Sequence, residues 1–154
     1  MSHAPQKPPL AKEPGSGKAP SASSHIRIAR PSQNISKAER FYVDGLGLKV
    51  LWRCGPDATG GHPLLMLGWP GAAWHLELVD DSHAETPAQP TEEDLLVIYV
   101  DESIDPAVID RLVAAGGERV TARNEYWEEF GVTVADPDGY RLVLSQRGWA
   151  NEAL

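Results

Sequence analysis

The feature that most constrains the fold is an internal repeat in the order of the predicted elements. Two stretches of similar length each read as one strand, one helix and then three strands. In the first stretch the predicted elements cover residues 25–30, 36–48, 49–54, 63–69 and 73–79. In the second they cover residues 94–100, 105–117, 118–123, 131–136 and 140–146. A sheet of four strands buries only one face against its single helix, so the other face of each unit must meet something else.

Capping residues mark where both predicted helices begin. Ser36 is the expected N-cap of the first helix, with Glu39 three residues later in the capping-box position. Asp105 is the expected N-cap of the second helix, and Pro106 occupies the first helical position, where its missing N–H is harmless. Glycines follow both helices and are expected to end them.

The domain organisation follows from composition. Residues 1–24 are rich in Pro, Ser, Ala, Lys and Gly and offer almost no apolar side chains, so they are predicted to be a disordered tail. The predicted domain covers residues 25–150, with its two modules at 25–80 and 94–147. A chain of 154 residues favours a single domain of this kind.

Charge and composition exclude several classes of partner. The formal net charge is −8, and the first 24 residues contribute +2, so the rest of the chain carries −10. An acidic body repels phosphate backbones, which argues against nucleic acid. No apolar stretch is long enough to span a membrane, and the N-terminus lacks a signal-peptide core. With Cys54 as the single cysteine, the cytoplasm is the expected location.

Alternation along the strands separates two sets of side chains. A uniformly apolar set, which includes Ile26 and Ile28, should pack on the helices. A mixed set should line a shared cavity between the modules. The mixed set comprises His25, Arg27, His75, Glu77, Leu95, Val97, Tyr99, Arg141, Val143 and Ser145. A mostly apolar wall with a few polar groups is typical of a small-molecule pocket.

The charged members of this lining admit three interpretations, one of which is a mobile or solvent-exposed arrangement. Arg27 or Arg141 could pair with Glu77, because an unpaired buried charge is costly. Alternatively, one arginine could hold the carboxylate or enolate of a ligand, which suits the planar guanidinium. We predict a salt bridge from Glu77 to Arg27 or to Arg141, with Arg27 as the leading candidate.

The segment "NEYWEEFG" (124–131) adds two aromatic side chains beside the predicted cavity. Tyr126 and Trp127 could stack on a ligand at its mouth, or one could cap the core while the other stiffens the loop. The predicted ligand-binding residues are therefore His25, Arg27, His75, Glu77, Tyr99, Tyr126, Trp127 and Arg141.

Two motifs within the repeat carry a resemblance to a known superfamily. Paired β-α-β-β-β modules with the segments "AERFYVDGLGLKV" and "DPDGYRLVL" resemble the glyoxalase/bleomycin-resistance/extradiol-dioxygenase (vicinal oxygen chelate, VOC) superfamily over about residues 25–147. The segments "RIARP", "WHLEL", "DLLVIY" and "NEYW" resemble a small branch of bacterial glyoxalase-like proteins; Glu125 stands where that branch tends to have proline. The resemblance implies an α+β fold in which a cupped eight-stranded mixed sheet carries helices on its outside.

The resemblance also implies where a divalent metal would be bound. The family's ligand positions fall on His25 and Glu77 in the first module and on Leu95 and Val143 in the second. Leucine and valine offer no lone pair, whereas a catalytic metal needs about three protein ligands. His75 could supply a third ligand, but nearby arginines would oppose a cation. The metal site is therefore expected to be incomplete, and no cofactor is predicted.

Three functions remain open at this stage. The first is binding of a small organic molecule without chemistry, as in the antibiotic-sequestering members of the superfamily, which commonly form dimers; a homodimer is thus an open expectation here. The second is a metal-dependent lyase, isomerase or dioxygenase in which Glu77 or His75 moves a proton. The third is a structural or interaction protein with a vestigial cup.

Overall fold

The computed structural model describes residues 17–55 and 62–154 and contains both predicted β-α-β-β-β units. The elements of the first unit are β1 (Ile26–Ser32), α1 (Ile35–Glu39), the π-helical turn η1 (Arg40–Gly45), β2 (Lys49–Cys54), β3 (Leu64–Gly68) and β4 (Trp74–Asp80). Those of the second are β5 (Leu95–Tyr99), α2 (Pro106–Ala114), β6 (Glu118–Val120), α3 (Glu125–Phe130), β7 (Gly131–Ala135) and β8 (Arg141–Ser145). The predicted α+β class is confirmed, and α3 is an addition to the predicted repeat.

The strands are divided between two mixed sheets of four. The strand orders are β1-β4-β3-β2 and β5-β8-β7-β6. In each sheet the first strand pairs in parallel with the last, and the other pairs are antiparallel. Within residues 17–55 and 62–154, no strand pairs with the outer edge of β1 or of β5. The two modules are therefore not joined by strand pairing within this chain.

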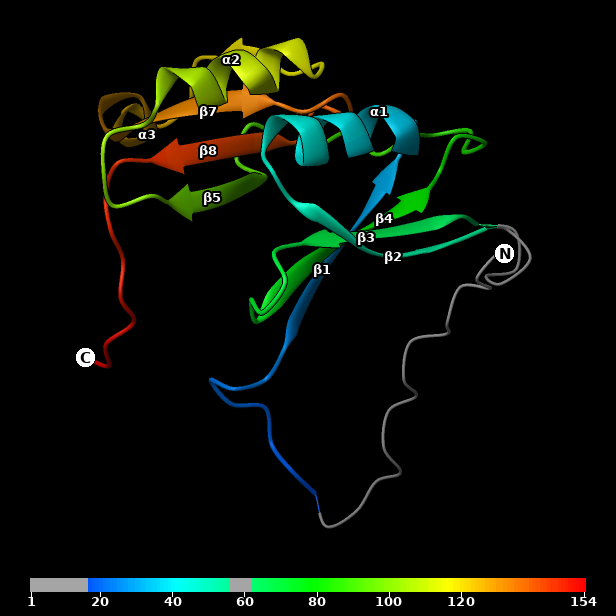
Figure 1. The fold of residues 1–154 in the computed structure, drawn as a ribbon, viewed down its shortest axis with the longest axis horizontal. Helices are drawn as coiled ribbons and strands as arrows, with labels where there is room; N and C mark the ends of the chain where they lie inside the picture. The colour runs from blue at the N-terminus through cyan, green and yellow to red at the C-terminus, as the bar shows by residue number, and fades with distance from the viewer. Residues whose placement is uncertain (1–16, 56–61) are drawn as a thin grey trace.

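One hydrophobic core joins the modules instead. The helical segment α1–η1 packs against α2, and both rest on the sheets (Figure 1). Gly45 allows this approach, because a Cβ there would lie 3.1 Å from Leu112 Cδ2. The fully buried side chains of the core include Phe41, Tyr42, Leu65, Leu67, Leu76, Leu112, Val134 and Leu142.

The apolar face of β1 departs from the prediction. Ile26 and Ile28 were expected to pack on the helices, yet Ile26 is 59% exposed and Ile28 lies at the surface. The first half of β1 runs away from α1 and extends beyond the body (Figure 1). The short α1–η1 segment therefore leaves this part of the strand uncovered.

Polar contacts between the modules cluster at the turn that precedes β8. The Tyr42 hydroxyl donates to Asp136 Oδ2 at 2.6 Å, and both side chains are buried. The Ser32 hydroxyl donates to Asp138 Oδ2 at 2.7 Å. The buried Arg30 places Nη1 3.5 Å from the Tyr42 oxygen. The "DPDG" turn of the second module is thus fastened to β1 and η1 of the first.

The helix starts are partly as predicted. Asp105 accepts from the Ala107 N–H at 2.9 Å and caps α2, as expected. The cap of α1 is Asn34 rather than Ser36, since Asn34 Oδ1 accepts from the Lys37 N–H at 3.0 Å. The chain turns into the helix earlier than the capping-box pattern indicated, and Asn34 is the side chain that reaches the free N–H.

The predicted tail of residues 1–24 lies mostly outside the described residues, which begin at 17. Residues 17–24 form no helix or strand and are mainly exposed. In the part of the chain that the structure covers, every helix is too short or too polar to cross a membrane.

Candidate functional site

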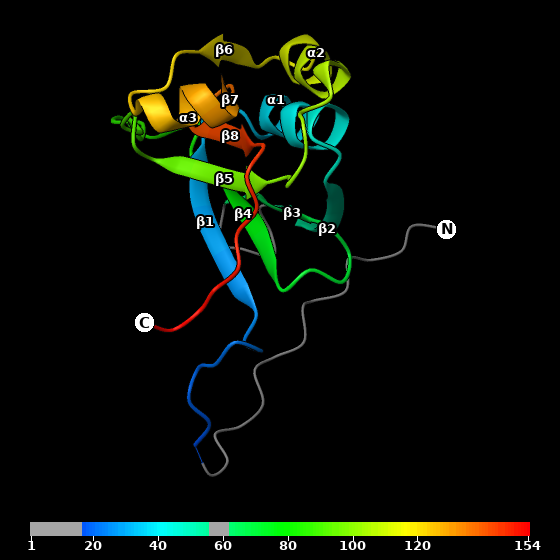
Figure 2. The same ribbon diagram turned by 90° about the vertical axis from the view of Figure 1, so that its left-hand side faces the viewer.

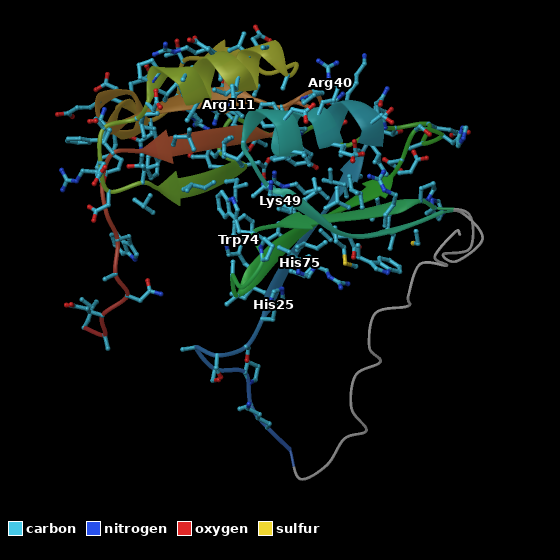
Figure 3. The ribbon with its side chains drawn as sticks, viewed as in Figure 1. His25, Arg40, Lys49, Trp74, His75 and Arg111 are labelled. Carbon is cyan, nitrogen blue, oxygen red and sulfur yellow. The ribbon has the colours of Figure 1, made fainter. Side chains whose placement is uncertain are left out.

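Four of the predicted site residues form one hydrogen-bonded network on β1 and β4. Arg27 Nη1 lies 3.0 Å from Glu77 Oε2, which confirms the predicted salt bridge. Arg27 Nε donates to His75 Nε2 at 3.0 Å, and His75 Nδ1 lies 2.6 Å from His25 Nε2. Arg27 and His75 are register partners in the parallel pair, so alternation places the four on one face. His25 and His75 lie on the side of the sheet away from α1 (Figure 3).

Burial differs along this network. The His75 residue is 9% exposed and the Glu77 side chain 12%, whereas the Arg27 side chain is 47% exposed. Burial lowers the pKa of His75, and the charge of Arg27 and the neighbouring His25 lower it further, against a smaller opposite effect of Glu77. This lowered pKa favours the neutral form of His75, and the charges of Arg27 and Glu77 offset each other.

Arg141 does not take part in this network. Its Nη2 lies 3.5 Å from Glu92 Oε1, and its Nη1 donates to the Thr121 carbonyl at 3.1 Å. Arg141 therefore ties the connector between the modules to the segment after β6, and the alternative pairing with Glu77 is not formed.

The predicted aromatic residues come together in the second module. The ring centroids of Tyr99 and Trp127 lie 6.3 Å apart, and those of Tyr126 and Trp127 lie 4.9 Å apart. Tyr99 also stacks on Trp149 at 6.1 Å, and Trp149 is 72% exposed. Trp149 was not expected at the site, since its position near the end of the chain carries no strand or motif signal.

The helix α3 covers the sheet face that was expected to line the second half of the cup. It packs on β7 and β8 on the side opposite α2 (Figure 2). Val143 and Ser145, predicted as cup lining, are fully buried, and Thr133 beside them is 1% exposed. The segment was interpreted as a loop, but Asn124 accepts from the Tyr126 N–H at 3.0 Å and starts a helix. This half of the lining is therefore packed rather than open.

The residues present do not fit a divalent-metal site. At the family's ligand positions in the second module stand Leu95 and Val143, which supply no donor atom. In the first module, the Glu77 carboxylate is already paired with a guanidinium, which repels a cation. Among residues 17–55 and 62–154, no group of three His, Cys, Asp or Glu side chains could hold a metal ion.

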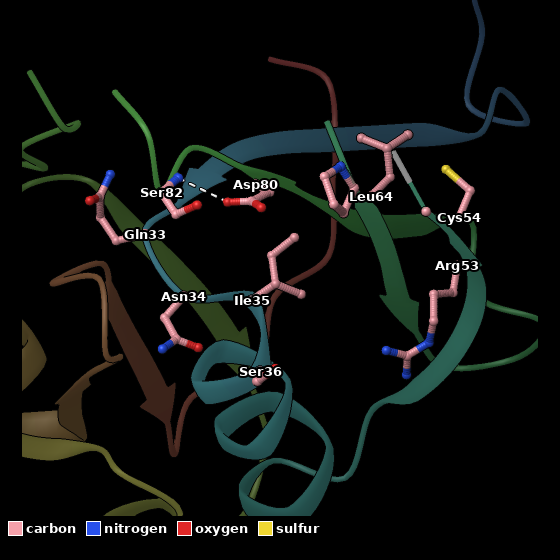
Figure 4. A pocket seen from close by; sticks show the side chains of 11 residues that line it. Gln33, Asn34, Ile35, Ser36, Arg53, Cys54, Leu64, Asp80 and Ser82 are labelled. Carbon is pink, nitrogen blue, oxygen red and sulfur yellow. Dashed lines mark hydrogen bonds between the residues drawn. The ribbon is translucent and has the colours of Figure 1, made fainter. Parts of the chain in front are cut away.

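A pocket of about 470 Å³ lies at the start of α1, away from the network (Figure 4). Arg53 at its wall forms a bidentate ion pair with Glu39 at 2.6 and 3.1 Å. Asp80 accepts from the Ser82 N–H at 2.8 Å. Its charged groups are thus bound to neighbours, and none of the predicted site residues lines it.

Two apolar pockets lie along β5 and the segment after it. One of about 340 Å³ lies between Ile28 of β1 and residues 96–99, with Trp69 and Trp74 in its wall. The other, of about 470 Å³, lies beside the start of α2 and shares Trp69 and Ile98 with the first. Tyr99 lines the smaller pocket, while the polar network on β1 and β4 lines neither. Neither of these two pockets therefore brings the network and the aromatic cluster together.

Comparison with known proteins accounts for this fold. The family models described as the YycE-like N-terminal domain and the YycE-like C-terminal domain match residues 26–79 and 93–146. The chain belongs to the YycE-like family. The uncharacterized protein YycE of Bacillus subtilis (strain 168) is 37% identical to it over 123 residues, which cover 79% of this chain and 87% of that protein.

Solved structures place the YycE-like chain in the superfamily that the motifs indicated. The crystal structure of the YycE protein from Bacillus subtilis superposes with a TM-score of 0.75 at 33% identity, over 85% of this chain and 95% of that one. That protein is of unknown function and is described as a candidate glyoxalase or fosfomycin-resistance protein. TnmS3, an antibiotic-binding protein from Streptomyces sp. CB03234, superposes with a TM-score of 0.57 at 26% identity, over 83% of this chain and 99% of that one. The predicted relationship to the glyoxalase/bleomycin-resistance (VOC) superfamily is thus confirmed.

Proposed function

We propose that this YycE-like protein binds a small organic molecule against the polar face of β1 and β4, without chemistry at a protein-bound metal. The observation that carries the proposal is the closed network of His25, Arg27, His75 and Glu77 on a face that retains exposure. Such a network holds polar groups in fixed positions beside apolar surface, which is the usual composition of a ligand site. The similarity to an antibiotic-binding protein supports binding rather than turnover.

The test compares two ion pairs of the first module. Native mass spectrometry of the purified protein and of Arg27→Gln should show a co-purifying small molecule on the first and its loss on the second. Arg53→Gln is the matched control, because Arg53 also pairs with a glutamate of the first module but lies outside the network. A ligand that is retained in Arg27→Gln, or lost equally in Arg53→Gln, would contradict the proposal.

The alternative is a metal-dependent lyase, isomerase or dioxygenase, and elemental analysis separates it from binding alone. A complete three-ligand site should fill on supplementation. We expect less than about 0.2 equivalents of divalent metal to remain after desalting, because such a site needs about three donors. Near-stoichiometric metal that is lost in Glu77→Gln would favour the enzyme.

We further propose that a second copy of the chain completes the site. Among the described residues no strand pairs with the outer edges of β1 and β5, and exposed apolar side chains lie there, with Ile26 on β1, Tyr99 on β5 and Val100 directly after it. Charge favours a cross-wise arrangement. The module at 25–80 has six Lys and Arg residues and five Asp and Glu residues, so its net charge is +1. The module at 94–147 has five Arg residues and eleven Asp and Glu residues, so its net charge is −6. The first module of one copy is thus suited to the second module of its partner.

Light scattering tests this homodimer. The expected mass is twice that of the 16.7 kDa chain, and Ile26→Glu should shift it towards the monomer. Val113→Glu is the matched control, because Val113 is also exposed and apolar but lies on α2. A monomer at all concentrations, or a dimer insensitive to Ile26→Glu, would contradict the arrangement. A cytoplasmic location is proposed with it, since Cys54 is a buried free thiol.

A further inference from the structure

We infer that His25 presents an N–H donor to the ligand, so that the site takes a molecule with a carbonyl, enolate or phenolate oxygen rather than a cation. The inference rests on the proposed function, because it names the chemistry of the ligand at the same face. It is derived from the order of donors and acceptors along the network of Arg27, His75 and His25.

The order begins at Arg27, because a guanidinium has donors and no acceptor. Arg27 Nε donates to His75 Nε2 at 3.0 Å, so Nε2 carries a lone pair and no proton. A neutral imidazole has one N–H, and the proton of His75 must therefore lie on Nδ1. The lowered pKa of His75 agrees with a neutral ring.

The second ring follows from the first. His75 Nδ1 lies 2.6 Å from His25 Nε2, so His75 donates and His25 Nε2 accepts. A proton on His25 Nε2 would face the proton on His75 Nδ1, which excludes both the other tautomer and the doubly protonated ring in this arrangement. His25 therefore carries its proton on Nδ1.

This last N–H is available to a ligand. Within residues 17–55 and 62–154, no side chain or backbone group hydrogen-bonds to His25 Nδ1, and His25 is exposed. Arg27 directs each of its three nitrogens at a protein group, since Nε faces His75, Nη1 faces Glu77 and Nη2 lies 3.8 Å from Met66 Sδ.

The chemistry of the ligand follows from these two facts. The group that points outward is a neutral donor beside a neutralised ion pair, so it favours an acceptor oxygen and gives no lone pair to a cation. A carboxylate ligand would compete with Glu77 for the guanidinium of Arg27. A carbonyl oxygen on an apolar skeleton suits this donor, because Trp52 and Met66, which are register partners next to Glu77, lie on the same face of the sheet.

Nuclear magnetic resonance of ¹⁵N-histidine tests the proton order directly. Long-range ¹H–¹⁵N spectra near neutral pH should show His25 and His75 both protonated on Nδ1, whereas the exposed His83 provides an internal reference. Arg27→Leu should abolish this order and Arg53→Leu should leave it. A proton on Nε2 of His75 in the unchanged protein would overturn the inference.

Matched probes test the ligand chemistry. 1-Tetralone carries an acceptor oxygen, and 1-aminotetralin carries an ammonium group on the same skeleton. Titration should show tetralone binding about fivefold more tightly than the amine, as expected for one hydrogen bond. His25→Phe should remove this preference and His83→Phe should keep it. No binding of tetralone, equal binding of the amine, or a preference that survives in His25→Phe would overturn the inference. The proposed function would still hold in that case if native mass spectrometry showed a co-purifying ligand on the unchanged protein and its loss in Arg27→Gln.

Discussion

Replacing Tyr42 by phenylalanine should destabilise the protein through one buried carboxylate. The Tyr42 hydroxyl donates to Asp136 Oδ2 at 2.6 Å, and Asp136 Oδ1 accepts from the backbone N–H groups of Asp138 and Tyr140 at 2.8 and 3.0 Å. Burial is the main cause that raises the pKa of Tyr42, so it remains a neutral donor. Without the hydroxyl, Oδ2 keeps its burial and loses its short hydrogen bond.

The magnitude follows from the charge on the acceptor. A hydrogen bond to a charged group contributes about 1.5–3 kcal/mol, and an orphaned buried acceptor adds its desolvation, so we expect a loss of about 2–3 kcal/mol in unfolding free energy near neutral pH. Urea unfolding followed by tryptophan fluorescence measures it. Tyr126→Phe is the control, because that hydroxyl is exposed and should cost less than about 0.5 kcal/mol.

The pH dependence gives a second readout. Burial raises the pKa of Asp136 in the folded state, and the Tyr42 hydrogen bond partly opposes that rise. A carboxyl with a raised folded pKa favours folding most when protonated, and this contribution is lost as pH rises from the unfolded through the folded pKa. Removing Tyr42 raises the folded pKa further, so the loss should shrink at acidic pH. A loss below about 0.5 kcal/mol, or one equal to that of Tyr126→Phe, would refute the reasoning, since it would match an ordinary surface change.

The remaining predictions concern packing and the network. Gly117→Ala should destabilise by about 2–3 kcal/mol or more in urea unfolding, because overpacking a core costs that much and a Cβ there would lie 2.6 Å from Phe41 Cε2. His75 should titrate below its ordinary pKa of 6.5 in a histidine NMR titration. Because its folded pKa is lowered, its contribution to stability should be lost as pH falls from the unfolded to the folded value. Arg27→Gln and Glu77→Gln, singly and together, should show a coupling of about 0.5–1 kcal/mol, since Arg27 is half exposed and solvent screens the pair. No measurable coupling would show that this pair adds nothing to the fold.

The sequence predicted the repeat well because its signals are local. Alternating strands, the Asp105 cap and the "DPDG" turn depend on neighbours along the chain, and each element lies within a few residues of its predicted range. The cap of the first helix was predicted wrongly, since the capping-box pattern indicated Ser36 whereas the chain enters the helix at Asn34, soon after β1 ends at Ser32.

The first half of the candidate site was also within reach of the sequence. Side chains alternate between the two faces of a strand, so His75 and Glu77 lie on the same face. Because an unpaired buried charge is costly, the Glu77 carboxylate was expected to have an arginine partner such as Arg27. The second half was not, because "NEYWEEF" lacks helical length and its coverage of Val143 depends on a packing partner. Trp149 likewise joins Tyr99 through the path of the chain end and not through any local pattern.

By itself, the sequence determined two β-α-β-β-β modules, the alternation of side chains between the faces of each strand, and the need of Glu77 for an arginine partner, because hydrophobic periodicity, capping and charge neutralisation are readable from the residues themselves. The tertiary structure decided that the strands form two sheets, that Arg27 rather than Arg141 pairs with Glu77, and that α3 fills the face expected to be open; within residues 17–55 and 62–154 it also left the outer edges of β1 and β5 without a strand partner. These outcomes depend on which surfaces meet after the elements have formed, and the hydrophobic effect that drives such contacts is non-directional, so no single segment specifies them.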